Sequence, residues 1–529
     1  MRRWNGWGDE SNSMDLPDSA GVFLQNILGS GQKLIDASLK EVIAKVPKSK
    51  APNHKLICID LEDRVRHATG QSLADYLSTR SGNIKYFPDG VCYPTNNQEV
   101  KDILALAKLH NLELIPYGGG TSVAGHINVQ DSKRAVITVD MSRMNRLVDL
   151  DIKSHIATFG AGTPGPMVEA QLRAKGYTLG HFPQSFELST VGGWVASRSS
   201  GQQSLRYGRI EQMFAGGSIE TFNGTLEIPT FPASSAGPDL REIILGSEGR
   251  FGIISEVKVR VTKLPDKEKF SVIFFPNWQL ATEFCQQAVQ DKISLSMLRL
   301  SNAIETQTQL KLAGHEKSIA YLEQYLNLRH CKNDKCMLTF GITGSRKQVK
   351  ATQSQIKSLV KKYKGISTGT FLGNRWAQNR FKFPYLRDAL WQQGYSVDTL
   401  ETATDWQNVD SLLDKVENNL LTTIDGKKVH VFTHLSHVYG QGCSLYTTYV
   451  FANDTTFDET YKTWQLLKNS TSNKIVNNKG TISHQHGVGK DHAPYLEVEK
   501  GHLGIKVIES LCEHFDPDKQ LNPGTLLND

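Results

Sequence analysis

The sequence predicts an α+β protein with two domains after a mostly helical N-terminal extension. A chain of 529 residues is too long for a single hydrophobic core. From Asn97 onward helix-like and strand-like periodicities alternate, and three glycine-rich turns fall within one segment of that pattern. We therefore expect an extension over 1–85, a first domain over 86–265, a cap domain over 266–475 and a C-terminal segment, 476–529, that returns to the first domain.

The periodicities place the elements of the first domain in order. Apolar residues around Val100 recur at helical spacing, and residues 112–115 then alternate as a strand, which the turn beginning at Pro116 ends. Later elements are expected as strands at 135–139 and 155–159, a helix from about Met167, and a half-exposed strand around Val257.

The composition limits the classes of partner. The 60 Lys and Arg residues exceed the 54 Asp and Glu residues by six, a mild excess that suits an anionic small molecule, a lipid or an acidic membrane surface but not nucleic acid. Seven scattered cysteines argue against a disulfide framework and for a reducing compartment. Cys331 and Cys336 are expected in a solvated loop rather than in a metal site, because no second pair at ligand spacing follows.

The sequence shows no signal for secretion or membrane insertion. No stretch approaches the ~20 apolar residues of a membrane span, and the first residues carry no apolar run of the signal-peptide kind. The final residues, Leu527 to Asp529, are not a peroxisomal address of the Ser-Lys-Leu type. We expect a cytoplasmic protein that is at most peripheral to a membrane. Its oligomeric state stays open, a homodimer included.

The first glycine-rich turn, at 117–122, directly follows a predicted strand. Three successive glycines leave backbone N–H groups free of side-chain obstruction, so this loop can wrap a pyrophosphate. A tight turn between two strands explains the same residues equally well. The candidate binding residues of this turn are Pro116, Gly118, Gly119, Gly120, Thr121 and Ser122.

The second and third turns have the same character. Small residues and glycines there allow backbone to approach a planar ring or a phosphate, and Ser and Thr supply hydroxyl donors. Three such turns in one α/β segment indicate a large ligand with a long polar spine. Their candidate binding residues are Pro183, Ser185, Ser189, Thr190, Gly192, Gly193 and Ser197 in the second turn, and Glu248, Gly249, Gly252 and Ile253 in the third.

A literal G-x-G-x-x-G lies at 160–165, with Glu187 some 22 residues beyond it. The pattern suggests a Rossmann turn for a nicotinamide cofactor. Pro164 argues against this, because it removes a backbone N–H that a phosphate turn needs, and Pro166 already marks the start of a helix. We expect this segment to turn the chain beneath the ligand instead.

The three turns, in this order and spacing, resemble the FAD-binding segments of the vanillyl-alcohol-oxidase family. The resemblance implies the two-domain PCMH-type FAD-binding fold with a cap domain. It also implies that His181 lies near the flavin. Family members that attach FAD through histidine carry that residue just after the glycine pair of the first turn, where this chain has Thr121. The resemblance therefore implies non-covalent FAD.

A second resemblance covers nearly the whole chain. The segment Trp4-Asn5-Gly6-Trp7-Gly8, the stretch 385–388 and the stretch 483–490 are similar to segments of the alkylglycerone-phosphate (alkyl-dihydroxyacetone-phosphate) synthase family. The family implies an exchange of the acyl group of acyl-dihydroxyacetone phosphate for a fatty alcohol, in which FAD undergoes no net redox change. It assigns substrate binding to the position of Arg387 and a functional role to that of Arg299.

The reaction needs a group near the flavin that removes a proton from carbon and returns it. The family's tyrosine falls at Thr448 by gapless counting, with Tyr446 and Tyr449 close by, and its three consecutive histidines are replaced by His-Gln-His at 484–486. The candidates for proton transfer are Tyr446, His484 and His486.

Two other classes of function compete with this one. A metal-independent FAD oxidoreductase acting on a D-2-hydroxy acid or a glycerol-phosphate-like substrate fits the same flavin turns. Its metal-dependent relatives carry a glutamate where this chain has Gln485, a poor metal ligand, so we expect no metal. A non-catalytic flavin-binding protein is disfavoured, because a retired site would not need to keep Arg299, Arg387, His484 and His486.

Overall fold

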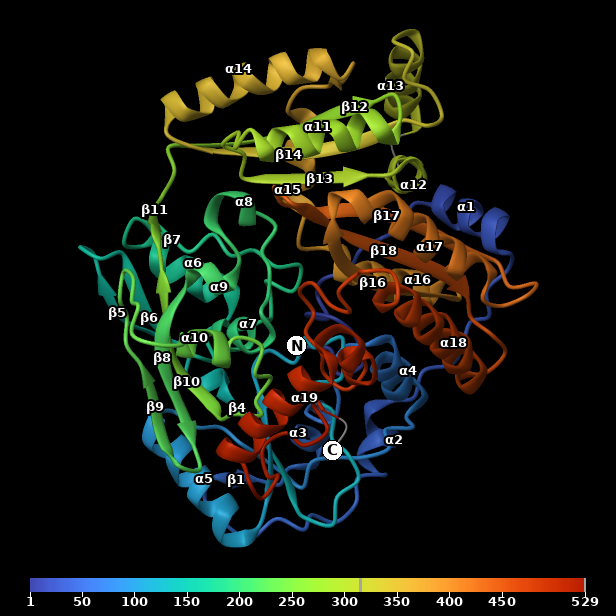
Figure 1. Ribbon diagram of the computed structural model, residues 1–529. Coiled ribbons are helices and arrows are strands. Elements are labelled where there is room, and N and C mark those ends of the chain that lie inside the picture. Colours follow the sequence, from blue (N-terminus) through green and yellow to red (C-terminus); the bar gives the residue numbers. More distant parts are fainter. Residues whose placement is uncertain (314–315, 528–529) are drawn as a thin grey trace.

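The computed structural model describes residues 1–313 and 316–527. Asn528 and Asp529, which belong to the expected C-terminal segment and to the final residues considered as a targeting address, lie outside these ranges. The described chain forms a flavin-domain half and a cap half, each built around its own sheets (Figure 1). No helix of the described residues is long and apolar enough to cross a membrane.

The flavin-domain half contains two main sheets. The first is four-stranded, with β2, β4 and β3 parallel and β1 antiparallel at the edge. The second is five-stranded and antiparallel. The strands of the first sheet, in sheet order, are β1 (Ile57–Cys58), β2 (Gly90–Cys92), β4 (Val136–Asp140) and β3 (Glu113–Tyr117). Those of the second sheet are β5 (Leu147–Asp151), β6 (Ile156–Gly160), β10 (Ile253–Arg260), β8 (Phe214–Thr221) and β9 (Gly224–Ile228). A separate two-stranded sheet consists of β11 (Thr262–Lys263) and β7 (Tyr177–Thr178).

The helices of this half connect and cover these sheets. In α5 the side chain of Asn96 caps the first turn, and the apolar face around Val100 is buried. Charged residues alternate with fully buried Val257 and Val259 along β10. Both elements confirm the sequence prediction. The helices are α5 (Asn97–His110), η1 (Met141–Arg143), α6 (Gly165–Arg173), α7 (Val191–Ser197), α8 (Ser204–Tyr207), α9 (Ile210–Met213) and α10 (Leu240–Ile244).

The cap half contains one seven-stranded antiparallel sheet. Helices α11 and α14 lie across β12 to β14, and α17 and α18 pack on the strands at the other end (Figure 1). The strands in sheet order are β15 (Ile366–Ser367), β12 (Lys267–Phe275), β14 (Cys336–Gly344), β13 (Met297–Ser301), β17 (Val429–Val438), β18 (Gly442–Ala452) and β16 (Tyr395–Asp405). The helices are α11 (Trp278–Gln290), α12 (Ala303–Leu312), α13 (Glu316–Leu328), α14 (Arg346–Lys362), α15 (Phe371–Asn379), η2 (Phe383–Tyr385), α16 (Leu386–Gln392), η3 (Trp406–Asn408), α17 (Val409–Thr422) and α18 (Phe457–Val476).

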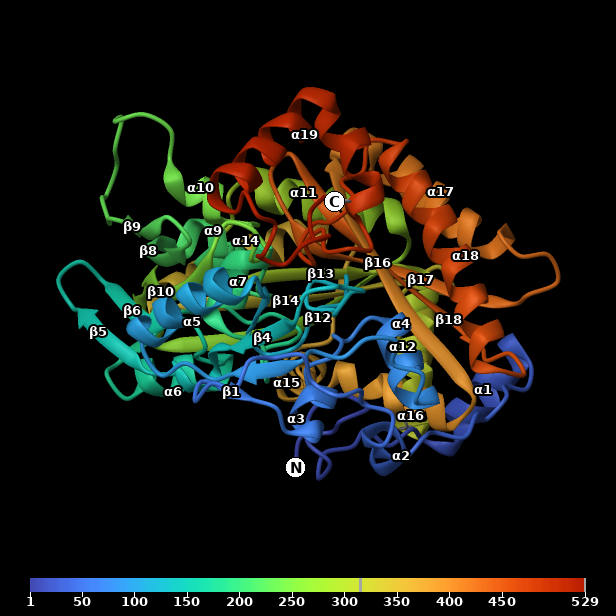
Figure 2. The same cartoon turned by 90° about the horizontal axis from the view of Figure 1, so that it is seen from below.

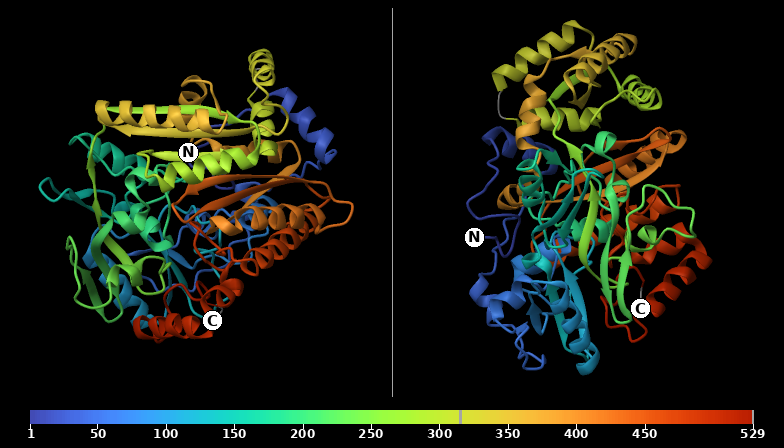
Figure 3. Two further views of the ribbon diagram at one scale, coloured as in Figure 1. Left: turned by 45° about the horizontal axis from the view of Figure 1, so that its top comes forward. Right: turned by 90° about the vertical axis from the view of Figure 1, so that its left-hand side faces the viewer.

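The N-terminal extension does not form a separate unit. Its strand β1 pairs with β2, α4 packs on α18 and β16, and α1 packs on α12 and β17. In the right-hand view of Figure 3 the N-terminus lies at mid-height. Long irregular stretches separate its helices, so the extension is less helical than expected. These helices are α1 (Asp18–Leu28), α2 (Leu39–Ile43), α3 (Leu61–Arg66) and α4 (Leu73–Ser81).

The C-terminal segment packs against the flavin-domain half. It contains η4 (Ala493–Tyr495) and α19 (Leu496–Phe515), which Figure 2 shows between α10 on one side and α17 and α18 on the other. Cys512, Leu526 and Leu527 pack into the hydrophobic core formed by β6, β8 and β10. The chain thereby closes over the domain that it left near residue 265.

The expectation of a solvated loop at Cys331 and Cys336 is wrong. Both side chains are fully buried. Cys336 opens β14 within the cap core, and the thiol of Cys331 contacts the carbonyl oxygen of Phe275 at 3.3 Å. Each cysteine therefore acts as a small apolar core residue, since a thiol is buried at little cost.

Candidate active site

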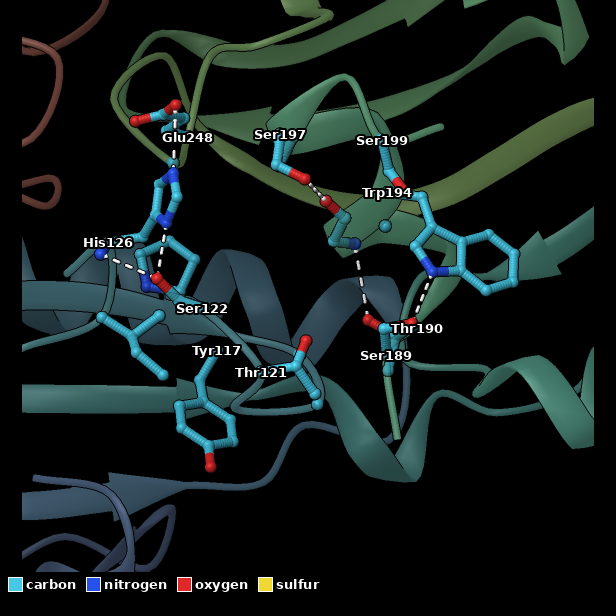
Figure 4. Close-up of a pocket in the computed structure, with 18 of the residues that line it drawn as sticks. Tyr117, Thr121, Ser122, His126, Ser189, Thr190, Trp194, Ser197, Ser199 and Glu248 are labelled. Atoms are coloured by element: carbon cyan, nitrogen blue, oxygen red, sulfur yellow. Dashed lines mark hydrogen bonds and ion pairs between the residues drawn. The ribbon is translucent and has the colours of Figure 1, made fainter. Parts of the chain in front are cut away.

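A cavity of about 1080 Å³ lies between the three glycine-rich turns (Figure 4). Most residues predicted from these turns line it. They are Pro116, Gly118, Gly119, Gly120, Thr121, Ser122, Ser185, Ser189, Thr190, Gly192, Gly193, Ser197, Glu248, Gly249, Gly252 and Ile253. Two predicted residues lie elsewhere. Pro183 lines a second cavity, and His181 is buried behind the wall, where it contacts Ser199 Oγ at 3.1 Å and packs on Trp194.

Close packing between the first two turns explains their glycines. A Cβ at Gly119 would overlap the carbonyl oxygen of Leu188, so only glycine lets the turns approach. The hydroxyl of Thr190 caps α7 by accepting from Gly193 N at 3.4 Å, and Trp194 Nε1 donates to Ser189 Oγ at 2.7 Å (Figure 4). Where these two turns meet, the cavity wall is thus built largely from backbone and small hydroxyl side chains.

Glu248 joins the third turn to two other segments. Its carboxylate accepts from the backbone N–H groups of Val488 and Gly489 at 2.5 and 2.7 Å. It also faces His126 Nε2 at 3.1 Å, and His126 Nδ1 lies 2.6 Å from Ser122 Oγ (Figure 4). Burial opposes a charge on His126, but the carboxylate outweighs it and raises the pKa of this histidine. No local pattern marks His126, and the sequence prediction missed it.

A second cavity, of about 1710 Å³, adjoins the first. Thr121, Ser185, Gln485 and His486 belong to the walls of both. The cap sheet supplies one side of it through the two-residue period of its strands. On β13, Met297 and Arg299 face the cavity, whereas the alternate leucines Leu298 and Leu300 enter the cap core.

Both predicted arginines line the second cavity, and both have protein partners. Arg299 Nη2 donates to Glu305 Oε1 at 2.6 Å, an ion pair that overcomes burial and lowers the pKa of Glu305 to about 2. Arg387 Nη1 donates to the carbonyl of Gln71 at 2.6 Å, and its Nη2 lies 3.8 Å from Asp398. The cap thus brings both arginines to a cleft against the glycine turns, whose Thr121 and Ser185 line the same cavity.

Strand β18 settles which tyrosine faces the cavity. Tyr446 and Thr448, two residues apart, both line it. Tyr449 points to the opposite face, where it is fully buried and its hydroxyl donates to Asp398 at 3.3 Å. Burial raises the pKa of Tyr446 to about 12, so its phenol is protonated at neutral pH.

The two predicted histidines differ in position. His486 lines both cavities, and its ring meets that of Tyr446 edge-on at 5.9 Å. His484 lines neither cavity, because its Nε2 lies 2.6 Å from Arg209 Nη1 and 2.7 Å from Tyr439 Oη. His484 is therefore too far back to touch a ligand and supports the wall instead. Burial lowers the pKa of both histidines.

Glu401 fixes the segment that carries these histidines. Its Oε1 accepts from the backbone N–H groups of His484, Gln485 and His486 at 2.9–3.0 Å. Burial opposes its charge, but the two imidazoles and these N–H groups hold the pKa of Glu401 well below its usual range. Gln485, at the place of the family's middle histidine, reaches both cavities. Its Oε1 is buried and has no hydrogen-bond partner among the described residues.

The first cavity fits FAD. Its walls offer backbone and hydroxyl groups from three separate turns. Among the described residues no cluster of three or more His, Cys, Asp or Glu side chains is arranged to hold a metal ion. The family model for an FAD binding domain matches residues 88–228, and the model for the C-terminal domain of FAD linked oxidases matches residues 264–526. Fold and site thus define an FAD-dependent enzyme.

Comparison with known proteins narrows the class. An alkyldihydroxyacetonephosphate synthase of Dictyostelium discoideum is 31% identical, over 98% of this chain and 85% of the relative. A solved structure of an alkyldihydroxyacetonephosphate synthase superposes with a TM-score of 0.85 at 27% identity, covering 98% of each chain. The protein belongs to the alkyldihydroxyacetonephosphate synthase family. The structure of p-cresol methylhydroxylase, at 12% identity and TM-score 0.70 over 93% of this chain and 96% of its own, shares the fold.

Proposed function

We propose that the protein is an FAD-dependent alkylglycerone-phosphate synthase, which exchanges the acyl group of acyl-dihydroxyacetone phosphate for a fatty alcohol in ether-lipid synthesis. One observation carries this proposal. Tyr446, His486 and the arginines Arg299 and Arg387 line a single cavity that adjoins the FAD cavity, in a chain related to synthases over its whole length. When bound, FAD supplies an isoalloxazine ring that acts without net oxidation or reduction.

The positive side chains of the second cavity bind the substrate. Arg387 holds the phosphate, because a guanidinium matches its oxygens in pairs. The Asp398 carboxylate beside it is shared with Lys468, also at 3.8 Å, and therefore does not neutralise Arg387 alone. Arg299, held by Glu305 and by His434, adds positive potential on the cap side.

Proton transfer is divided between two residues. The lowered pKa of His486 leaves its imidazole neutral at pH 7, so it accepts the proton removed from carbon. Tyr446 is protonated and returns a proton. The Glu401 carboxylate, 3.7 Å from His486 Nδ1, stabilises the imidazolium that forms. Tyr446 thus takes the place of the family tyrosine that is absent at Thr448.

Product analysis tests the proposal. The purified protein, supplied with palmitoyl-dihydroxyacetone phosphate and hexadecanol, should release palmitate and form the alkyl ether lipid in equal amounts. The alternative, a metal-independent oxidoreductase acting on a D-2-hydroxy acid or glycerol phosphate, is less well supported because the synthase match spans the whole chain. Bleaching of the flavin absorbance by such substrates under anaerobic conditions, without ether formation, would favour that alternative.

We also propose peripheral contact with a membrane from the cytoplasm, because both proposed substrates carry long alkyl chains. Aromatic and apolar side chains of the cap are exposed, among them Tyr321, Leu328 and Phe371. Sedimentation with lipid vesicles tests the contact. A homodimer stays a prediction, which light scattering of the pure protein tests.

A further inference from the structure

Arg380 is a cation of the second cavity that forms no ion pair with any residue in 1–313 or 316–527. It follows α15 and lines the cavity wall. Its Cζ lies 4.6 Å from the ring centroid of Phe182 and 4.8 Å from that of Phe381, so aromatic rings cover the guanidinium. The Nε and Nη1 atoms are buried and make no hydrogen bond within the part of the chain that the structure describes. Unsatisfied buried donors are costly, and each needs a reason.

Arg380 differs in this respect from the other arginines of the cavity. Arg299 is paired with Glu305, and Arg387 faces Asp398. Glu268 and Glu169 act on Arg380 only at longer range, and within residues 1–313 and 316–527 neither forms an ion pair with it. Burial lowers the pKa of Arg380, because the two distant carboxylates do not offset the loss of water around its charge. An anion bound in the cavity would offset that cost.

The surroundings of Arg380 indicate which kind of anion fits. Trp376, Phe383 and Pro384 line the same cavity next to it in the chain. A cation beside an apolar wall is complementary to an amphiphilic anion, in which a charged head continues into an alkyl chain. A carboxylate head also matches a guanidinium in a two-pronged geometry.

We infer that Arg380 binds the carboxylate of the fatty acid that leaves the substrate, an inference that rests on the proposed function. In this step the bond between the substrate carbon and the ester oxygen breaks, and the electron pair leaves with the oxygen as a carboxylate. The alcohol oxygen bonds to that carbon and gives its proton to a base of the site, so no oxidant or reductant is needed. Arg380 receives the negative charge as it develops.

Calorimetric titration of the holoenzyme with decanoate tests this assignment. Arg380→Met keeps the apolar stem but removes the charge and should weaken decanoate binding about tenfold or more. Arg380→Lys should weaken it less. Decanol, with the same chain and no charge, and glycerol 3-phosphate should bind both variants as they bind the parent. Arg375→Met is the matched control, since Arg375 lies on α15, lines neither cavity and contacts the Ala313 carbonyl.

The outcomes separate this inference from the proposed function. Unchanged decanoate affinity in a folded, FAD-loaded Arg380→Met protein would overturn it, and so would a loss confined to glycerol 3-phosphate. If Arg380→Met fails to load FAD, Arg380→Lys is used in its place. A lysine variant with the decanoate affinity and the turnover of the parent protein would overturn the assignment. If decanoate binding depends on Arg380 but no ether product forms, the carboxylate site is supported and the proposed synthase function is contradicted.

Discussion

At the scale of single residues, strand geometry separates reactive groups from structural ones on the same element. Tyr446 and Tyr449 lie three residues apart on β18, so the two-residue period sends them to opposite faces. One phenol meets His486 in the cavity, and the other is buried on the opposite face of the sheet, where it donates to Asp398. Gapless counting against a family pattern cannot distinguish them, because it ignores which face a residue occupies.

This contrast gives a paired test. Tyr446→Phe removes the proton donor, and kcat for alkyl transfer should fall about 10²–10⁴-fold with FAD content and thermal stability unchanged. Tyr449→Phe removes one buried hydrogen bond, so it should cost about 1 kcal/mol of unfolding free energy and leave turnover intact. Full activity in Tyr446→Phe would show that another group transfers the proton.

Arg387 gives a second prediction at this scale. Arg387→Lys keeps the charge but loses the two-pronged geometry, whereas Arg387→Ala loses both. The alanine variant should lose about 1.5–3 kcal/mol of substrate binding, a roughly ten- to hundredfold fall in kcat/KM. The free energy of unfolding should change little, because Asp398 keeps its ion pair with Lys468 and its 2.6 Å hydrogen bond from Trp464 Nε1. Loss of stability or flavin together with activity would make Arg387 a structural residue.

At the scale of elements, Asp388 in α16 holds the N-terminal segment and α4 against the cap. Its carboxylate accepts from Arg3 at 3.2 Å, Tyr76 Oη at 2.8 Å and Arg80 at 2.6 Å. Trp7, whose backbone N–H also points at this carboxylate, lines the second cavity. One carboxylate therefore fixes three segments that are far apart in sequence.

Removing this charge should be costly. Asp388→Asn leaves Arg3 facing a neutral amide and leaves Arg80 with Asp36 as its remaining carboxylate partner, and we expect a loss of about 3 kcal/mol, measured by denaturant unfolding. Asp239→Asn is the control, because Asp239 is exposed, pairs with Arg241, and asparagine caps a helix as well as aspartate does. Its effect should stay within about 0.5 kcal/mol. Equal losses in the two variants would contradict a special role for Asp388.

The elements also show what the sequence alone can predict. The helix α5, the strand β10 and the glycine turns are encoded locally, by periodicity and by backbone freedom, and all were predicted. His126 and Arg380 were missed, because their roles depend on partners brought close by tertiary folding. His484 was predicted as a reactive group, but only the fold shows that Arg209 and Tyr439 occupy its ring nitrogen.

At the scale of the whole molecule, the FAD cavity is lined by the first domain and by the C-terminal segment, which contributes Gln485, His486 and Asn522. We expect the FAD to be released when the protein is denatured. Thr121 offers no imidazole, and in His126, which does line the cavity, both ring nitrogens already face Ser122 and Glu248. Acid precipitation should leave yellow FAD in the supernatant. Flavin that remains with the precipitated polypeptide would contradict this.

Buried histidines make the stability of the molecule depend on pH. Burial lowers the pKa of His181 and His492 to about 3 and that of His430 to about 4. In the unfolded chain these groups titrate near 6.5, so below that pH the unfolded state binds more protons than the folded state. The stability that they contribute is fully present above pH 6.5 and is lost as the pH falls.

The melting temperature should accordingly be flat from pH 8 to 7 and fall steadily between pH 6.5 and 4.5. Ordinary carboxylates titrate below that window. Asp491, whose pKa burial raises to about 6, and His126, whose pKa is also raised, oppose the three histidines, so the fall should be less steep than the histidines alone would make it. A tenfold difference in proton affinity between the folded and unfolded states corresponds to about 1.4 kcal/mol, so the combined loss from the three histidines should reach several kcal/mol.

His430→Gln, which can keep a hydrogen bond to Thr308, should reduce the slope by removing one of the titrating groups. Scanning calorimetry, with flavin absorbance recorded in parallel, distinguishes unfolding from loss of FAD. An unchanged slope of melting temperature against pH in His430→Gln would show that this histidine is not buried in its neutral form.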